Sequence, residues 1–564
     1  MNRSQFDLVV TPLLELVYPD SHETARIQLL ELTDRYVERL AGAAQEPVPN
    51  HHTAVLIAYG GAIRRQAEAP LATLRRVLTS QVGATISHVH LLPMFPSTSD
   101  DGFAVVDYRK IDPDLGDWAD VTALGGYQLM FDFVANHVSS HCPWFTGWLA
   151  GDDKHAEFFI PFDPAFDTSM VTRPRTSPLF HSYPRADGTR ATVWTTFSDD
   201  QIDINMADIP TLVEMTDVLL GYITRGASMI RLDAIGFLWK ESGTSCMHLP
   251  QTHAIVKLWR AVVERVRPGT QIITETNVPH AQNISYFGTG ADEAHQVYQF
   301  ALPPLVLHSF TAGNTDALSR WAMTITPVSD AATYFNFLAS HDGIGMRPTE
   351  GILTEDERQM LVHKTLDNGG RISMTPGPDG SQTVYELNIN YLDALASGDE
   401  LHRPAVVAAK GLAAHSILCS VIGVPAIYYH SLFGSCGDRA GMRASGINRS
   451  INREVLDADQ LIGELVSDER RSIVFSGIKH MLTVRGQHHA FSPYGPHQVE
   501  RLDPRVFAVR RGMGTDDEIL CITNVTDQEV ELATVSGLDV LSGRNRQGLS
   551  LPAYGYEWIA GTSH

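Results

Sequence analysis

Eight short apolar runs recur along the chain, separated by loops and by stretches with helical periodicity. The runs are AVLIAY (54–59), HVHLLP (88–93), LMFDFV (129–134), SMIRLD (228–233), QIITET (271–276), QVYQFA (296–301), TYFNFLASHD (333–342) and VPAIYY (424–429). Most are apolar on both faces, which is typical of parallel strands covered by helices. The stretch THAIVKLWRAVVERVRPG places its apolar residues on one helical face and stops at Pro268 and Gly269. Eight strands alternating with helices predict a (β/α)8 TIM barrel.

The segments around these runs have other patterns. Residues 1–50 carry charges opposite an apolar stripe and predict an N-terminal helical extension. We expect the barrel to occupy residues 51–485, with an inserted subdomain after the third strand at about 138–225. A turn-rich loop is expected within 343–400. Partial period-two alternation over 490–564 predicts a small all-β C-terminal domain.

Composition narrows the class of function. The chain has 564 residues and a formal net charge of −22, which argues against a general binder of nucleic acid or anionic membranes. The five cysteines form no CxxC pair, so the sequence predicts a reducing compartment and neither a zinc pattern nor a disulfide framework. The N-terminal residues do not resemble a signal peptide and no apolar run is long enough to span a bilayer, so we expect a cytoplasmic protein.

Three acidic residues stand at the ends of predicted strands. Asp233 ends the fourth run, Glu275 the fifth and Asp342 the seventh. The carboxyl ends of barrel strands carry the chemistry in such folds, so these acids would meet over the barrel mouth. Any one of them could be a helix cap or a solvated loop acid, but three together point to a shared task. Paired carboxyl groups suit glycoside chemistry, in which one attacks the anomeric carbon and the other protonates the leaving oxygen.

Several stretches resemble the motifs of a known family. GFAVVDY, DFVANH, IRLDAIGF, IITETN and FLASHD are similar, in this order, to motifs of the α-amylase superfamily, glycoside hydrolase family 13. VHLLPMFPSTSDDGFAVVDYRKIDPDLGDWAD, VWTTFSDDQIDI and FALPPLVLHSF look like its sucrose phosphorylase subfamily, and the resemblance covers roughly residues 54–485. HLPQTHAIVKLWR, TNVPHAQNISYFG and HDGIGMRPTEGIL most resemble the glucosylglycerate phosphorylases of that subfamily.

The resemblance implies a catalytic role for three motif acids. Asp233 matches the nucleophile that forms a β-glucosyl-enzyme, and Glu275 matches the general acid and base. Asp342 matches the acid that bridges sugar hydroxyls and steadies the transition state. Arg231 matches the arginine that keeps the nucleophile ionised and oriented. It stands two residues before Asp233, so both side chains leave the strand on one face, where a guanidinium lowers the pKa of a neighbouring carboxyl group.

Other positions match residues that hold the sugar. The resemblance implies that the sugar is bound by Asp100, Phe103, His137, His341 and Arg453. Among these, Asp100 and Arg453 match the pair that grips the far hydroxyl of the terminal glucose. A shift in the alignment would make Asp101 or Arg449 the true members of that pair. Phe197 is a second ring that could stack on the sugar, although aromatic loop residues are as often part of the core.

Arginines in loops near the expected barrel mouth supply groups that bind anions. They are Arg175 in the inserted subdomain, Arg347 after HDGIG, Arg371 after NGG, and those within DRAGMRASGINRSINRE. Each alone is as readily an ordinary solvated arginine, but their placement favours binding of inorganic phosphate and of a substrate carboxylate. Which arginine serves which anion stays open. No cofactor and no metal are predicted, although Asn136 lies where many amylases supply a calcium ligand, which leaves a structural calcium open.

These features together predict a glucosyltransferase that acts by double displacement. It would convert an α-glucoside and the co-substrate phosphate to α-glucose 1-phosphate, with D-glycerate as the first-choice acceptor. The alternatives are a phosphorylase of sucrose, sucrose 6F-phosphate or glucosylglycerol, a hydrolase or transglucosidase of the same family, and a non-catalytic binding protein. The expected partners are a small sugar and phosphate, without nucleic acid or membrane, and the sequence leaves the number of subunits open.

Overall fold

Eight parallel strands close into a barrel at the centre of the computed structural model, which describes residues 1–376 and 382–561. In barrel order the strands are β1 (Val55–Ala58), β3 (His88–Leu91), β4 (Gln128–Val134), β9 (Ala227–Asp233), β10 (Gln271–Thr274), β11 (Gln296–Tyr298), β12 (Thr333–Asn336) and β16 (Val424–Tyr428). Each coincides with one of the eight apolar runs. The predicted (β/α)8 fold class is therefore confirmed.

Two of these strands end before the acidic residue that the sequence places at their end. β12 stops at Asn336, so Asp342 lies in the following loop and not at the strand end as expected. β10 stops one residue before Glu275, whereas Asp233 is itself the last residue of β9. The apolar residues that follow β12 are also buried, which explains why their pattern continues that of the strand. Burial alone does not tell a strand from a packed loop.

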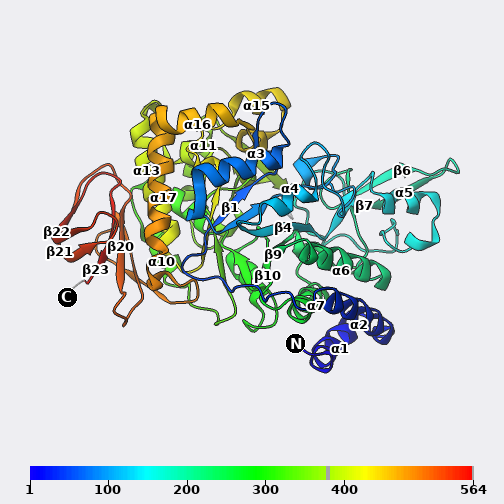
Figure 1. Cartoon of the computed structure of the whole chain (residues 1–564). Coiled ribbons are helices and arrows are strands. Elements are labelled where there is room, and N and C mark those ends of the chain that lie inside the picture. Colours follow the sequence, from blue (N-terminus) through cyan, green and yellow to red (C-terminus); the bar gives the residue numbers. More distant parts are fainter. Residues whose placement is uncertain (377–381, 562–564) are drawn as a thin grey trace.

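Helices surround the barrel and carry its crossovers (Figure 1). They include α3 (Pro70–Val77), α4 (Trp118–Ala123), α6 (Ile209–Thr224), α7 (Pro250–Val266), α9 (Leu302–Ala312), α11 (Glu355–Asp367), α13 (Pro404–Ser420), α16 (Ala458–Ser467) and α17 (Glu469–Arg485). α7 shows how the pattern becomes structure, because Ile255, Trp259 and Val262 recur at helical spacing and are all buried. Pro250 opens this helix at its first position, where the missing N–H group costs nothing.

Two helices outside the barrel form an N-terminal hairpin. α1 (Arg3–Val17) and α2 (His22–Arg39) pack against α6 and α7, as the blue and green ribbons of Figure 1 show. Phe6, Val10 and Leu14 of α1 are fully buried. The Tyr18 hydroxyl donates to the Met206 carbonyl oxygen over 2.6 Å, which ties the hairpin to the segment that leads into α6.

The connection after β4 forms the predicted inserted subdomain. β5 (His137–Ser139) pairs antiparallel with β8 (Gln201–Asp203), and this pair anchors the insertion next to β4. α5 (Pro143–Ala150) and the hairpin of β6 (Phe180–Pro184) and β7 (Arg190–Trp194) extend away from the barrel at the right of Figure 1. α6 then returns the chain to β9.

The loop after β12 contains strands that the sequence pattern did not indicate. β14 (Arg371–Pro376) and β15 (Gln382–Asn388) pair antiparallel, and β13 (Ile344–Gly345) pairs with β15 on its other side. The expectation of a turn-rich loop is therefore wrong for β14 and β15. The glycines and prolines between and beside these strands made the loop the more natural prediction. The part of the expected turn-rich loop at 377–381 lies outside the described residues.

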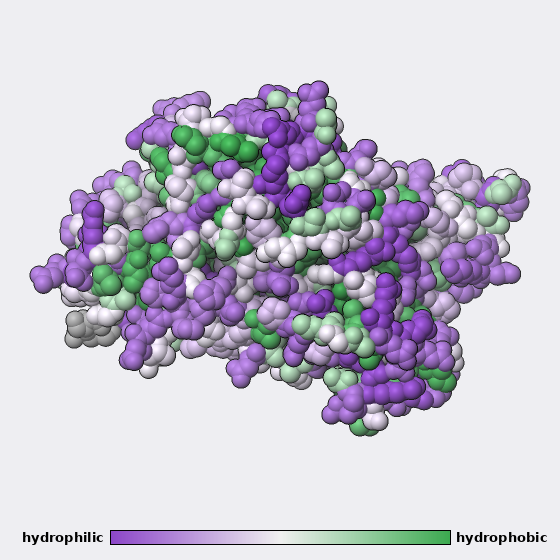
Figure 2. Space-filling model, in the orientation of Figure 1, coloured by the Kyte–Doolittle hydropathy of each residue, from purple (hydrophilic) through white to green (hydrophobic). Residues whose placement is uncertain are grey.

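The C-terminal residues form the expected small β domain. Its six-stranded sheet contains β18 (His497–Glu500), β19 (Val506–Arg511), β20 (Ile519–Asn524), β21 (Val530–Asp539), β22 (Arg544–Leu551) and β23 (Tyr556–Ala560). This sheet packs against α13 at the left of Figure 1. Polar residues cover most of the face in Figure 2, with smaller apolar areas between them. Among the described helices, none combines the length and the apolar composition that crossing a bilayer would require.

Candidate active site

A cavity lies over the carboxyl ends of the barrel strands. Concave pockets with a few convergent polar groups are the usual sites for small molecules. Every predicted catalytic or sugar-binding residue lines this cavity, except Arg231 and Arg453. The predicted residues in its wall are Asp100, Phe103, His137, Arg175, Asp233, Glu275, His341, Asp342 and Arg347. Segments that are far apart in the chain thus contribute to one pocket, as expected for this end of a barrel.

Arg231 lies beneath the cavity floor and holds Asp233 in place. Its Nη1 atom donates to Asp233 Oδ1 over 2.8 Å, which matches the prediction that both side chains leave β9 on one face. The same guanidinium pairs with Asp132 on β4, because the strand register sets Asp132 beside Arg231. Asp132 also contacts His90 Nε2 over 2.7 Å. Asp132 and His90 were not predicted, although an aspartate inside the apolar run LMFDFV was a usable signal.

Glu275 faces the same guanidinium from the next strand. Its Oε1 atom lies 3.7 Å from Arg231 Nη2, and the Ala234 N–H group donates to Oε2 over 3.4 Å. Ala234 has a φ of 51°, in the left-handed region, so the backbone turns sharply directly after Asp233. The two carboxyl groups therefore share one buried arginine and one cavity, which is the arrangement that a paired-carboxylate mechanism requires.

The protonation of this pair differs from the simple expectation. Burial raises the pKa of Asp233, and although Arg231 lowers it, the net pKa is well above the usual range. Burial likewise raises the pKa of Glu275, with Arg231 opposing the shift. The pair therefore holds a proton to higher pH than either acid would alone. Arg231 is 2.8 Å from Asp233 and 3.7 Å from Glu275, so this cation stabilises the charged form of Asp233 more than that of Glu275.

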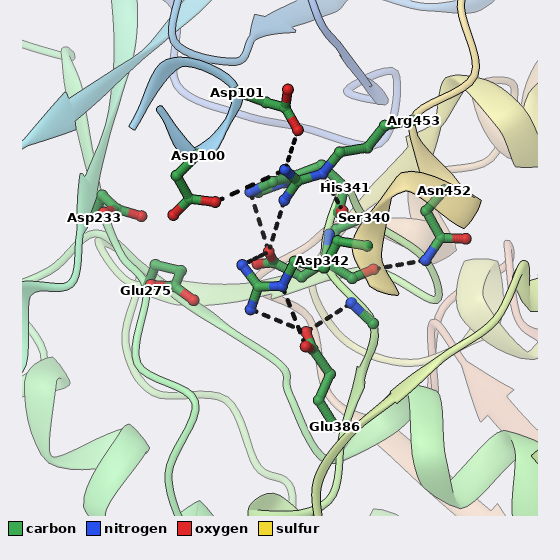
Figure 3. A network of polar contacts seen from close by, with 12 residues as sticks. Asp100, Asp101, Asp233, Glu275, Ser340, His341, Asp342, Glu386, Asn452 and Arg453 are labelled. Carbon is green, nitrogen blue, oxygen red and sulfur yellow. Dashed lines mark hydrogen bonds and ion pairs between the residues drawn. The ribbon is translucent and has the colours of Figure 1, made fainter. Parts of the chain in front are cut away.

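The pKa of Asp342 is shifted in the opposite direction, downward. Arg449 Nη1 lies 2.6 Å from Asp342 Oδ1, and Arg453 Nη2 lies 3.6 Å from the same oxygen (Figure 3). Burial alone would raise the pKa of Asp342, but Arg449 and its other charged neighbours hold that pKa below its usual range. Asp342 is therefore a permanent carboxylate at the cavity wall.

Only some of the residues considered for the aspartate–arginine pair reach the cavity. Asp100 and Arg449 line the cavity, whereas Arg453 lies behind the wall. Arg453 pairs with Asp101, lies 3.8 Å from Asp100 Oδ1 and donates through Nε to the His341 carbonyl oxygen over 3.0 Å. Figure 3 shows Arg453 between the two aspartates and His341. Asp100 and Asp101 have φ values of 51° and 47°, so this loop is held in a strained conformation beside the site.

Neutral imidazoles and aromatic rings complete the wall. Burial lowers the pKa of His137 to about 4 and that of His341 well below its usual value. Neutral imidazole both donates and accepts hydrogen bonds, which suits sugar hydroxyl groups. Phe103 stacks on His341 with ring centroids 4.8 Å apart, and Phe197 lies against His137 at 5.1 Å. Phe197 lines the cavity, as do Gln201 and Tyr385, which were not predicted.

Three of the predicted anion-binding arginines line the cavity, namely Arg175, Arg347 and Arg449. Arg175 lies over the rings of Tyr385 and Phe197, at 5.5 and 6.0 Å from the centroids. Arg347 also faces the cavity, with Glu350 3.7 Å from its Nε. Arg371 is exposed and is not among the lining residues. Cationic side chains thus stand in the wall of a pocket that also holds the three acids.

The residue at the candidate calcium position contacts a lysine. Lys240 Nζ donates to Asn136 Oδ1 over 2.9 Å and pairs with Asp203 Oδ2 over 2.6 Å. It also donates to the Phe237 carbonyl oxygen. An ammonium group therefore takes the place beside Asn136 that a cation would need. Within the described residues, no group of three or more His, Cys, Asp or Glu is arranged to hold a metal ion.

Comparison with known proteins agrees with this geometry. Residues 82–351 match the model of the alpha amylase catalytic domain. The chain is 46% identical to the glucosylglycerate phosphorylase of Spirochaeta thermophila, over 93% of this chain and 90% of the relative, and 41% identical to that of Escherichia coli, over 94% and 96%. It is 30% identical to a sucrose phosphorylase of Agrobacterium vitis, over 74% of this chain and 85% of the relative.

A solved structure shows the same fold. The crystal structure of sucrose 6F-phosphate phosphorylase from Thermoanaerobacter thermosaccharolyticum superposes with a TM-score of 0.73 and 23% identity, over 86% of this chain and 96% of that one. The relatives at 46% and 41% identity confirm the family resemblance noted in the sequence. The chain belongs to the α-amylase superfamily, glycoside hydrolase family 13, in the group that holds the glucosylglycerate and sucrose phosphorylases.

Proposed function

We propose that this protein is a retaining glycoside phosphorylase that transfers glucose from glucosylglycerate to phosphate. The observation that carries the proposal is the pairing of Asp233 and Glu275 on one buried arginine, inside a cavity that also contains Arg175 and Arg347. The glucosylglycerate phosphorylases among its relatives are similar over almost the whole chain. The products would be α-glucose 1-phosphate and D-glycerate.

In the first step, Asp233 attacks the anomeric carbon of the glucosyl unit. The bond from that carbon to the D-glycerate oxygen breaks, and the glycerate oxygen takes the proton of Glu275. A β-glucosyl ester of Asp233 results, and Glu275 becomes a carboxylate. Asp342, charged throughout because of Arg449, accepts hydrogen bonds from sugar hydroxyls and stabilises the positive charge that develops on the ring.

In the second step, an oxygen of hydrogen phosphate attacks the same carbon from the face that glycerate has left. The ester bond breaks, Asp233 regains its charge, and Glu275 takes the proton of the attacking oxygen. Two inversions leave the α configuration unchanged. The reaction draws on phosphate as a co-substrate and its chemistry requires no cofactor.

The arginines at the cavity support an anionic leaving group and an anionic attacking group. Arg175 and Arg347 can bind phosphate and the glycerate carboxylate, since guanidinium groups form paired hydrogen bonds with both. Without such cations, a pocket that contains Asp233, Glu275 and Asp342 would repel phosphate. We also propose a reducing compartment, the cytoplasm, because all five cysteines are free thiols.

Parallel donor assays test the proposal. Release of glucose 1-phosphate is measured from glucosylglycerate, sucrose, sucrose 6F-phosphate and glucosylglycerol, each with and without phosphate. We expect phosphate-dependent release from glucosylglycerate with the highest kcat/KM. Activity on another donor and none on glucosylglycerate would reject the acceptor while leaving a phosphorylase. Release of free glucose at equal rates with and without phosphate would instead identify a hydrolase.

A further inference from the structure

Glu386 is a buried carboxylate outside the set of predicted site residues. It lies on β15, in the strand pair that follows the seventh barrel strand, and is 1% exposed. Both of its oxygens are engaged. Oε1 accepts the Gly343 N–H group over 2.7 Å and Arg449 Nη2 over 3.1 Å, while Oε2 accepts Arg449 Nε over 3.2 Å. Figure 3 shows Glu386 below Asp342.

The contacts of Glu386 converge on Asp342 by two routes. Through Arg449, whose Nη1 is 2.6 Å from Asp342 Oδ1, Glu386 fixes the cation that pairs with Asp342. Through Gly343, it holds the backbone of the residue directly after Asp342. A Cβ atom at Gly343 would lie 2.4 Å from the Leu387 carbonyl oxygen, so only glycine lets this loop approach β15 so closely. The position of Asp342 is thus set by β15.

This arrangement solves a problem of geometry. An arginine beside a single carboxylate frequently forms a bidentate pair, in which two N–H groups occupy both carboxylate oxygens. Arg449 instead presents its Nε and Nη2 edge to Glu386 and only Nη1 to Asp342. Within the described residues, the ion pairs of Asp342 all run to Oδ1, which leaves the second oxygen available to the cavity that Asp342 lines. Supporting groups of this kind keep a functional side chain within the narrow range of useful positions.

We propose that Glu386 is a positioning residue that acts through Arg449 and Gly343 to hold one oxygen of Asp342 toward the bound glucosyl unit. The inference rests on the glucosyl transfer in the proposed function, but not on the identity of the acceptor. It assigns a role in that reaction to a residue that need not touch the substrate.

The test uses α-D-glucosyl fluoride, which transfers glucose without glycerate and releases a leaving group that needs no proton. Fluoride release in the presence of phosphate is measured for wild type, E386Q, R449A and the double variant. We expect E386Q to lower kcat/KM about tenfold to a hundredfold, the usual cost of losing a supporting partner. In the R449A background, E386Q should lower kcat/KM by no more than about threefold, because the arginine through which Glu386 mainly acts on Asp342 is already absent.

A chemical rescue separates positioning from a general structural role. Added guanidinium chloride, at concentrations below those that denature the protein, should restore part of the R449A rate, because Glu386 and Asp342 still form its binding place. The E386Q/R449A double variant should not be rescued. Should E386Q lose the wild-type melting transition, E386D carries the same test, since a side chain one methylene shorter cannot reach both Arg449 and Gly343.

Glu557 supplies the matched control. It is a buried glutamate whose two oxygens accept Arg546 Nε, over 2.9 Å, and Nη2, but it lies in the C-terminal β domain. E557Q should leave kcat/KM for glucosyl fluoride within about twofold of wild type. An E386Q enzyme as active as E557Q, or effects of E386Q and R449A that multiply fully, would overturn the inference.

The outcome also separates this inference from the proposed function. Wild-type turnover of glucosyl fluoride together with no turnover of glucosylglycerate would reject the proposed donor and leave the role of Glu386 testable. A wild-type protein that releases no fluoride above background would overturn the glucosyl-transfer role of the site, and the role of Glu386 with it.

Discussion

Asp233 and Glu275 contact the same arginine at unequal distances, and that inequality divides their tasks. Arg231 Nη1 lies 2.8 Å from Asp233 Oδ1, whereas Arg231 Nη2 lies 3.7 Å from Glu275 Oε1. Burial raises the pKa of both acids, and the closer cation stabilises the charge of Asp233 more than that of Glu275. The contacts of Arg231 therefore favour Asp233 as the attacking group and Glu275 as the proton donor.

Replacing Asp233 tests the first of these tasks. Asp233→Asn keeps the size of the side chain but removes the nucleophilic carboxylate, so kcat for phosphorolysis should fall by about 10⁴-fold or more. The melting temperature should stay close to that of wild type or rise, since the change removes a buried charge. Wild-type turnover in this variant would refute the assignment of the nucleophile.

The pH dependence tests the second task. Glu275 must be protonated to release glycerate, so kcat/KM should fall as the pH rises through its pKa. Because burial raises that pKa, the fall should occur above pH 4.5, the ordinary value for glutamate. Glu275→Gln should remove this limb and lower kcat/KM for glucosylglycerate by about 10²- to 10⁴-fold. The first fluoride release from glucosyl fluoride should change far less, and an equal loss with both donors would contradict the role.

At the scale of elements, Lys240 joins three segments around the barrel mouth. It links Asn136 after β4, Asp203 on β8 of the inserted subdomain, and the turn after β9 that follows Asp233. Asp203 is fully buried and also accepts the Thr196 N–H group over 2.7 Å. The inserted subdomain is therefore attached to the barrel through a buried charge pair, close to the residues that line the cavity.

Loss of the lysine charge should destabilise this junction. Lys240→Gln leaves Asp203 buried without its cation, a change that costs about 3–5 kcal/mol. The melting temperature, followed by circular dichroism, should fall by several degrees. Lys110 is the matched control, because it pairs with Asp107 over 3.0 Å but its side chain is 75% exposed. Lys110→Gln should change stability by less than about 1 kcal/mol, and equal effects of both substitutions would contradict this account.

At the scale of the whole molecule, buried arginines join the barrel to the C-terminal sheet. Arg485, at the end of α17, is 1% exposed and donates to carbonyl oxygens of His51, before β1, and Phe491, before β18, over 2.8 and 3.0 Å. Arg511 of β19 donates to the carbonyl oxygens of Ser420, the last residue of α13, and of Val421. Since carbonyl oxygens from separate elements share one donor, the two units are held as a single body.

Removing one of these donors should loosen the junction. Arg485→Met leaves several buried carbonyl oxygens without a partner, each costing about 1–3 kcal/mol. We expect a clear fall in melting temperature. Arg501→Met provides the comparison, because Arg501 bridges the sheet to Asp316 in an exposed pair 3.1 Å apart and should cost less than about 1 kcal/mol. A wild-type melting curve for Arg485→Met would show that the junction does not depend on it.

The sequence by itself determined the features that depend on local periodicity. The eight strands follow from short runs that are mostly apolar on both faces, and the helix over 250–266 from apolar residues at helical spacing. The shared face of Arg231 and Asp233 follows from their separation of two residues. The family motifs then indicated which strand ends carry acids. Such patterns are properties of neighbouring residues, so they are readable before the chain folds.

Only the tertiary structure decided how distant segments meet. The contacts of Arg449 with Asp342 and with Glu386 join residues more than sixty positions apart, and no spacing in the chain indicates them. The spacing of residues in the chain also does not indicate the contacts of Asp132 with Arg231 and His90, or that of Lys240 with Asn136. These contacts exist because closing the barrel and packing its loops bring charged groups into a space without water, where each must find a partner.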